Sequence, residues 1–215
     1  GDVNVDQVEA TIKKMFADVP APVNPAKREQ VSVPDNDLPL ISIAKDKEAS
    51  NTILYIFYKH DKLPNDLNRT IAGLVKDYIQ QICASIMDER FDDILHQANP
   101  PFIYAEAYDD DNFMIAKSKV AALAKEGEID STLTTLVKET QRVKQYGFTP
   151  SEYERARINV LKQYESAYNE RNNQKNDAYV REYVNHFTNG GYIPGIEMEY
   201  TLLNQIAQNI PVEQV

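Results

Sequence analysis

The sequence predicts an α+β fold in which a mostly antiparallel sheet packs in two layers against long helices. Strand-like segments occur as two pairs, one before and one after a long helical stretch, and several helices follow. Strands grouped between helices in this way are typical of two-layer α+β proteins. The length favours one domain over residues 1–215. We expect it to be truncated at both ends, since the chain starts at Gly1 and Pro211 opens an element that is not completed.

The longest element is expected between Asn65 and Tyr108, as a helix that breaks into a strand. Its apolar residues recur at three- and four-residue steps, which places them on one face of a helix. The segment 99–101, Asn-Pro-Pro, ends this helix because proline lacks an N–H donor and restricts the residue before it. The apolar positions are Leu67, Ile71, Leu74, Val75, Tyr78, Ile79, Ile82, Ile86 and Leu95.

The first strand pair is expected at 40–44 and 52–58, around a polar turn at 46–50. Segment 52–58 is apolar at both alternating sets of positions. It is therefore expected to be a central strand, covered on both faces.

The second strand pair is expected at 102–108 and 113–116, joined by the acidic segment 109–112. Aspartate and asparagine favour a hairpin turn there. A calcium loop is the alternative interpretation, although the segment lacks the glycine and the distal glutamate of an EF-hand.

Several helices have clear start and stop signals. Asn4 and Gln7 have the spacing of a capping box, and Thr149-Pro150-Ser151-Glu152 is a capping box with proline at the first helical position. Gly147 is a candidate C-cap for the helix before it. Two further helices are expected around 178–187 and 202–207.

Charge and hydropathy exclude two classes of partner. The chain has 23 basic and 33 acidic residues, a formal net charge of −10. An acidic surface repels phosphate backbones, so no nucleic acid partner is expected. No run of about 18 apolar residues occurs, so no membrane span is expected.

The only cysteine, Cys83, lies within the long helix. One cysteine excludes a disulfide framework and a thiolate metal cluster. A partly buried hydrophobic role is favoured over a reactive one. This cysteine content fits the cytoplasm and equally a bacterial cell envelope or periplasmic protein without disulfides.

No catalytic residue and no metal ligand is predicted, and the substrate-binding residues stay unassigned. His60, His96 and His186 have no partner at metal-ligand spacing, and neither H-E-x-x-H nor H-x-x-E-H occurs. The pairs at 89–90 and 92–93 are interpreted as solvated helix charges rather than acid–base groups.

Four segments resemble the pitrilysin/insulinase family of zinc metallopeptidases. The opening GDVNVD resembles the family's junction before a helix, and ERFDDI followed by NPPF resembles its helix end before a strand. The stretch GFTPSEYERAR is similar to its recurrent G-hydrophobic-T-x-x-E motif, and IPVEQV resembles the start of its next helix. These segments span nearly the whole chain, in order.

The resemblance implies a half-domain of a metallopeptidase clamshell, like that of mitochondrial processing peptidase. In the family, an upstream domain carries H-x-x-E-H and the zinc ion, and a second domain of related fold follows it. The chain resembles that second, non-zinc domain. Its implied partners are the upstream zinc-bearing domain, the opposite half of the clamshell and an unfolded peptide substrate, and this fragment alone is expected to be inactive.

One departure bears on which half is present. In the opposite half, the helix end carries an arginine and, seven residues later, a tyrosine that hold substrate. His96 and Ile103 stand near these places, and Tyr104 is displaced by one. The pair is not carried over, which favours the metal-bearing half.

Three functions remain open from the sequence. The leading one is a non-catalytic wall of the peptide-degrading chamber of a zinc-dependent metalloendopeptidase, which helps to hold extended substrate through a sheet edge. The second is a structural or assembly subunit of the same fold without proteolytic activity, since fold alone does not decide function. The third is an independent enzyme that uses carboxylates alone.

Overall fold

A computed structural model of the chain describes residues 3–26, 33–109 and 116–215. The chain divides into two compact units, residues 1–32 and 33–215. In the first unit, helix α1 spans Val5–Met15, and the side chain of Asn4 accepts a hydrogen bond of 3.0 Å from the Gln7 N–H. This N-cap confirms the start signal in the sequence.

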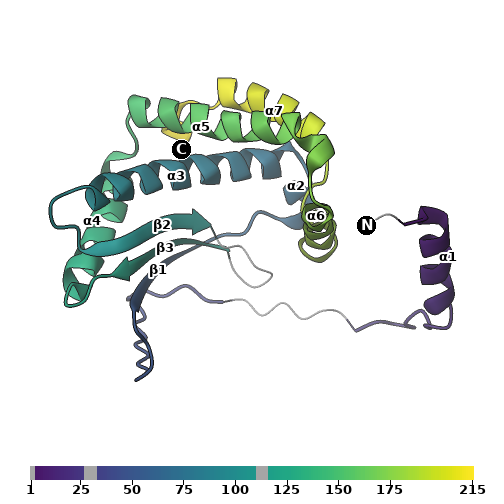
Figure 1. Cartoon of the computed structure of the whole chain (residues 1–215), viewed down its shortest axis with the longest axis horizontal. Coiled ribbons are helices and arrows are strands. Elements are labelled where there is room, and N and C mark those ends of the chain that lie inside the picture. Colours follow the sequence, from purple (N-terminus) through teal and green to yellow (C-terminus); the bar gives the residue numbers. More distant parts are fainter. Residues whose placement is uncertain (1–2, 27–32, 110–115) are drawn as a thin grey trace. The chain divides into compact units, whose positions relative to one another are not determined.

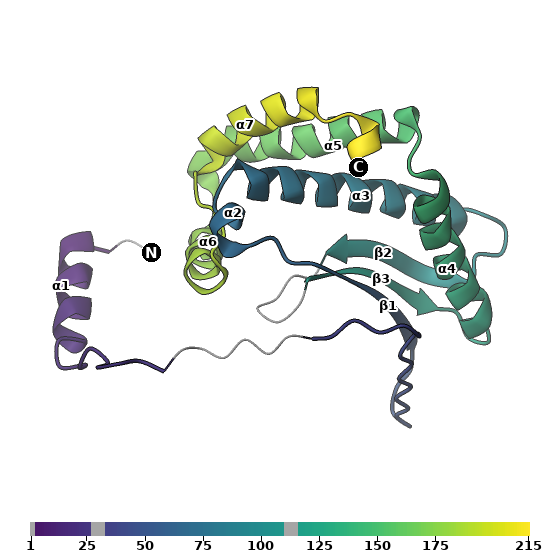
Figure 2. The ribbon, with the colours of Figure 1, turned by 180° about the vertical axis from the view of Figure 1, so that it is seen from behind.

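The second unit contains a three-stranded antiparallel sheet with the long helices on one of its faces (Figure 1, Figure 2). Its elements in chain order are β1 Thr52–His60, α2 Asn65–Asn68, α3 Ile71–Leu95, β2 Phe102–Asp109, β3 Ala116–Ala124, α4 Ile129–Tyr146, α5 Pro150–Asn169, the 3-10 turn η1 Arg171–Asn173, α6 Asn176–Asn189, α7 Ile196–Asn209 and the 3-10 turn η2 Val212–Gln214.

The expected long helix is present but divided in two: α2 ends at Asn68, and α3 begins at Ile71. The Thr70 hydroxyl accepts a hydrogen bond of 3.2 Å from the Ala72 N–H and caps α3. A Cβ at Gly73 would lie 2.2 Å from the carbonyl oxygen of Asn68, so only glycine fits this close approach of α2 to α3.

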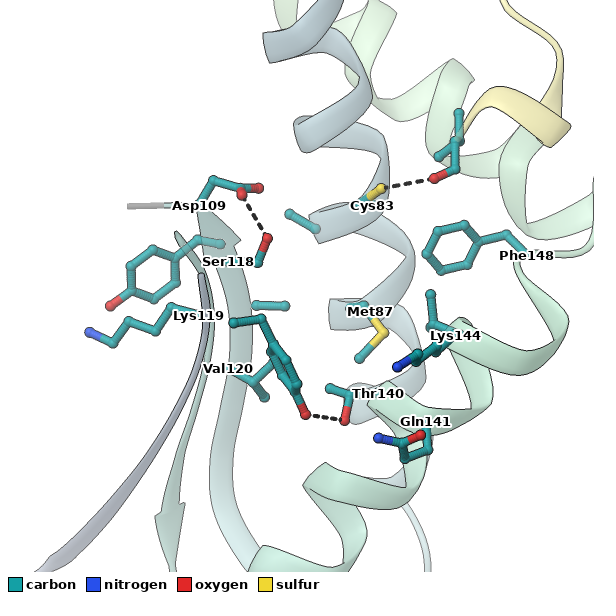
Figure 3. A pocket seen from close by; sticks show the side chains of 16 residues that line it. Cys83, Met87, Asp109, Ser118, Lys119, Val120, Thr140, Gln141, Lys144 and Phe148 are labelled. Carbon is teal, nitrogen blue, oxygen red and sulfur yellow. Dashed lines mark hydrogen bonds between the residues drawn. The ribbon is translucent and has the colours of Figure 1, made fainter. Parts of the chain in front are cut away.

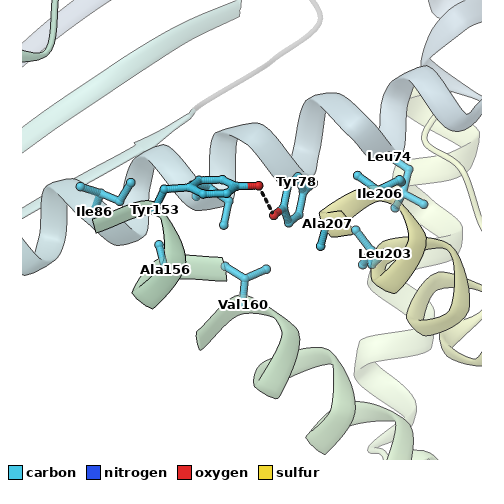
Figure 4. Packing of buried hydrophobic residues seen from close by; sticks show 10 residues of the cluster. Leu74, Tyr78, Ile86, Tyr153, Ala156, Val160, Leu203, Ile206 and Ala207 are labelled. Carbon is cyan, nitrogen blue, oxygen red and sulfur yellow. Dashed lines mark hydrogen bonds between the residues drawn. The ribbon is translucent and has the colours of Figure 1, made fainter. Parts of the chain in front are cut away.

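Helix α3 is buried on two sides, not along the single apolar face expected from the sequence. On one side α5 and α7 pack against it (Figure 4), where the Tyr78 and Tyr153 hydroxyls lie 3.2 Å apart. On the other side Met87 and Phe91 face the sheet. A helix placed between two layers needs apolar residues on both faces. The first cluster contains Leu74, Tyr78, Ile82, Ile86, Tyr153, Ala156, Val160, Leu203, Ile206 and Ala207.

The order of strands in the sheet, β1-β3-β2, corrects the prediction that segment 52–58 is central. The central strand is β3, whose sequence AKSKVAALA is rich in alanine and lysine and was not predicted beyond residue 116. These residues favour helices, and pairing with strands on both sides overrides that preference. Strand β1 is an edge strand, and one of its faces is open. The prediction that both faces of this segment are covered is therefore wrong.

Segment 40–44 is not a strand, so the prediction that it pairs with segment 52–58 is wrong. Leu40, Ile41 and Ile43 are about four-fifths exposed, at 83%, 84% and 79%. A strand requires a hydrogen-bonded neighbour, and no described strand pairs with this segment. The polar turn is confirmed, since the Asp46 carboxylate accepts a hydrogen bond of 2.8 Å from the Glu48 N–H.

A second cluster fills the space between the sheet and the helices. Phe91 of α3 and Phe102 of β2 meet edge to face, with ring centroids 6.2 Å apart at 87°. Val120 and Leu136 complete this layer from β3 and α4. The expected acidic turn, with its calcium alternative, and residues 113–115 lie outside the described residues.

Candidate functional site

The open face of the sheet carries exposed apolar side chains of β1. Because side chains alternate along a strand, Leu54 and Ile56 of β1 pack toward the helices, and the residues between them point the other way. Ile53, Tyr55 and Phe57 are about half exposed, at 54%, 50% and 51%.

Aromatic rings and lysines order this open face. The Tyr55 and Phe57 rings stack with centroids 6.0 Å apart and an interplanar angle of 19°. The Lys119 ammonium lies 4.2 Å from the centroid of Tyr55 and 4.8 Å from that of Tyr108. Cation–π attraction of this kind holds the rings in place on a surface that helices do not cover.

Tyr104 of β2 extends the same face. Its hydroxyl donates a hydrogen bond of 2.5 Å to the Glu106 carboxylate. That bond raises the pKa of Tyr104 to about 12, because the carboxylate stabilises the protonated phenol. Tyr104 is therefore neutral across the physiological range.

The two edges of the sheet differ. At the β2 edge, the Asp88 carboxylate of α3 accepts a hydrogen bond of 2.9 Å from the Ala107 N–H, and burial raises the pKa of Asp88. Within the described residues, no backbone hydrogen bond reaches the outer edge of β1. The open strand edge therefore belongs to β1, beside Tyr55 and Phe57.

The three histidines lie apart. Each ring lies within hydrogen-bond distance of a backbone carbonyl of its own segment, at 3.1 Å for His60, 2.7 Å for His96 and 2.6 Å for His186. His60 Nε2 also lies 3.4 Å from an Asp109 carboxylate oxygen. Across residues 3–26, 33–109 and 116–215, no group of three or more histidine, cysteine or acidic side chains is placed to hold a metal ion.

Arg90 corrects the interpretation of segment 89–90 as solvated charges. Its guanidinium is buried and donates two hydrogen bonds, of 2.7 and 3.0 Å, to the Glu152 carboxylate. Glu152 also completes the capping box of α5 with Thr149. The hydrogen bonds from Arg90 hold the pKa of Glu152 down to about 2. Arg90 and Glu152 belong to two of the segments that resemble the family, and their ion pair joins α3 to α5. Asp92 and Asp93 are exposed as expected.

Comparison with known proteins agrees with this interpretation of the motifs. Residues 1–160 match the family described as "Peptidase M16 inactive domain". The chain therefore belongs to the pitrilysin/insulinase (M16) peptidase family, as an inactive domain. No curated protein matches it significantly.

Solved structures share the fold over the whole chain. A "predicted insulinase family protease from Yersinia pestis" superposes with a TM-score of 0.80 at 12% identity, covering 100% of this chain and 46% of that one. The periplasmic protease PqqL from Escherichia coli superposes with a TM-score of 0.72 at 15% identity, covering 100% and 23%. This chain spans less than half the length of either protein.

The fold class and the family resemblance are thus confirmed, and the chain is a non-catalytic domain of a peptidase family. Among the described helices, none combines the length and the apolar character needed to cross a bilayer. The sequence did not assign the open face or the open edge, because both depend on the order of the strands.

Proposed function

We propose that this domain forms one wall of the chamber of a zinc-dependent metalloendopeptidase and helps to hold extended peptide substrate there. The observation that carries the proposal is the open β1 edge, which lies beside the exposed rings of Tyr55 and Phe57. An extended peptide that pairs with such an edge gains main-chain hydrogen bonds without requiring a particular sequence.

The aromatic surface adds side-chain contact to that pairing. A flat, stacked pair of rings accepts many apolar side chains with little loss of conformational entropy, because the rings have only two rotatable side-chain bonds each. Broad acceptance of unfolded peptides suits a surface that holds substrate rather than one that cleaves it.

The proposal leaves the bond-breaking chemistry to other parts of the parent protein. We expect an upstream domain to bind the zinc ion, which supplies an activated water for peptide hydrolysis when bound. The upstream domain and the opposite half of the clamshell are the proposed partners, and residues 1–215 are the proposed extent of this domain.

A binding measurement tests the substrate contact. A fluorescently labelled, unstructured peptide is titrated with the chain, and the anisotropy is compared between wild type and the double variant Tyr55→Ser/Phe57→Ser. Loss of about 1.4 kcal/mol of contact predicts about tenfold weaker binding. The control is Phe187→Ser on α6, an 88% exposed aromatic far along the chain from β1. Equal affinity of all three proteins would remove the open face from the proposal.

A second measurement addresses catalysis. After incubation with zinc and dialysis, we expect well below one zinc per chain and no cleavage of an unstructured peptide. Stoichiometric zinc with chelator-sensitive cleavage would contradict the proposed division of labour. The sequence of the parent gene distinguishes the peptidase from the alternative, a structural subunit. An upstream H-x-x-E-H motif that has lost its zinc ligands would favour the structural subunit.

A further inference from the structure

A cavity of about 320 Å³ lies between the sheet and helices α3 and α4, on the covered side of the sheet (Figure 3). Its lining includes Met87 of α3, Val120 of β3 and Val143 of α4, together with Phe148 after α4. Its size and apolar lining are those of a site for a small ligand.

Most polar groups around the cavity are already paired. The Tyr58 hydroxyl and the Thr140 hydroxyl lie 2.8 Å apart, and the Ser118 hydroxyl donates a hydrogen bond of 2.9 Å to Asp109. These pairs have less need of a ligand, since their hydrogen-bonding capacity is partly satisfied within the protein.

Lys144 differs from those groups. It lines the cavity from α4, and within the described residues its ammonium has no hydrogen bond and no ion pair. Figure 3 shows Asp109 and Lys144 on opposite sides of the cavity. A negative group on a ligand would therefore be attracted toward Lys144.

Cys83 also lines the cavity, and its thiol is uncharged. Burial raises the pKa of its thiol to about 12, and the thiol lies 3.6 Å from the carbonyl oxygen of Val215. Since the thiolate is the reactive form, this cysteine behaves as a small apolar group, as expected from the sequence.

We propose that the cavity binds a free alkyl carboxylate of medium chain length. The alkyl chain lies along Met87, Val120 and Val143, and the carboxylate forms an ion pair with Lys144. Burial of the chain stabilises the complex and the ion pair fixes its direction. The proposal is independent of the proposed chamber function, because it depends on Met87, Val120, Val143 and Lys144 and on neither Tyr55 nor Phe57.

Calorimetric titration tests the proposal with decanoate below its micelle concentration, alongside 1-decanol and decyltrimethylammonium. Decanoate is expected to bind once per chain and more tightly than either analogue. Lys144→Gln is expected to weaken decanoate about tenfold, as loss of one charged contact would, and to leave decanol unchanged. The control is Lys138→Gln, an exposed lysine on α4 that does not line the cavity.

A second variant locates the bound chain. Ala84→Leu introduces a larger side chain at the cavity wall and is expected to abolish decanoate binding, with folding checked by circular dichroism. Absence of saturable binding, equal affinity for decanol and decanoate, or retention of binding in Ala84→Leu would each overturn the proposal.

Discussion

The helical layer and the sheet layer of this domain differ in how completely they bury their apolar residues. Between α3, α5 and α7, Tyr78, Ile82 and Leu203 have no exposed surface. In the sheet, one face is packed in the same way, whereas Tyr55 and Phe57 on the other face remain about half exposed. The core between α3, α5 and α7 is therefore closed within the chain, whereas the sheet leaves an apolar face that another molecule could cover.

The contrast extends to polar groups. In the helical layer, Arg90 and Glu152 are matched by two hydrogen bonds across α3 and α5. In the sheet layer, the outer edge of β1 has no backbone partner within the described residues. Natural sheets usually protect such edges, as Asp88 does at β2, so an unprotected one is a candidate contact.

The largest expected effect comes from breaking the buried ion pair. Glu152→Ala leaves the Arg90 guanidinium buried without its carboxylate, and we expect the free energy of unfolding to fall by about 4 kcal/mol in urea titrations. Replacing Arg90 by methionine in the Glu152→Ala background should recover part of that loss, because an apolar side chain of comparable length needs no carboxylate partner. A double variant as unstable as Glu152→Ala would show that the pair does more than neutralise charge.

A somewhat smaller effect is expected on the covered side of the sheet. Phe102→Ala removes a fully buried ring that packs edge to face on Phe91, and should lower the free energy of unfolding by about 3 kcal/mol. Phe57→Ala, on the open face of the same sheet, is the matched control. Similar losses at the two positions would mean that the open face is covered in solution.

The dependence of stability on pH should follow Glu152. Its pKa is about 2 in the folded protein, against an ordinary value of about 4.3 in the unfolded chain. Because its pKa is lower in the folded protein, ionised Glu152 stabilises the folded state at pH values above its pKa in the unfolded chain. This contribution is lost as the pH falls from about 5 toward 2. Unfolding midpoints measured over this window should fall less steeply in Glu152→Gln than in wild type. Parallel curves would indicate that the carboxyl is not held by Arg90.

The smallest effect on stability is expected on the open face. Tyr55→Ser/Phe57→Ser should change the free energy of unfolding by less than about 1 kcal/mol, since exposed side chains contribute little to folding. Sedimentation should instead show weaker self-association than in wild type, because an exposed apolar surface favours association. A strictly monomeric wild type at high concentration would count against this.

Sequence periodicity located the helices well and the strands unevenly. The capping box at Thr149 and the C-cap at Gly147 follow local rules that hold in any tertiary context. The stop of the long helix was predicted at 99–101, and α3 ends before it, at Leu95. Strand β1 was also found from its β-branched and aromatic residues. Strand β3 was missed beyond its first residue, because its alanines and lysines are helix formers taken alone.

The candidate site shows the same division. Tyr55 and Phe57 were predicted to be buried, because apolar residues on both faces of a strand usually mean that both faces are covered. In the structure both side chains are about half exposed. The partnership of Arg90 with Glu152 spans 62 positions and has no local signal.

The sequence by itself determined the fold class, the approximate positions of the helices and the family, because periodicity, capping and short motifs act over a few residues. The tertiary structure alone decided the order of the strands, and with it the open face, the open edge and the cavity beside Lys144. These features depend on which distant segments pair and pack, and backbone pairing in a sheet is specified by the whole set of neighbours rather than by any one strand.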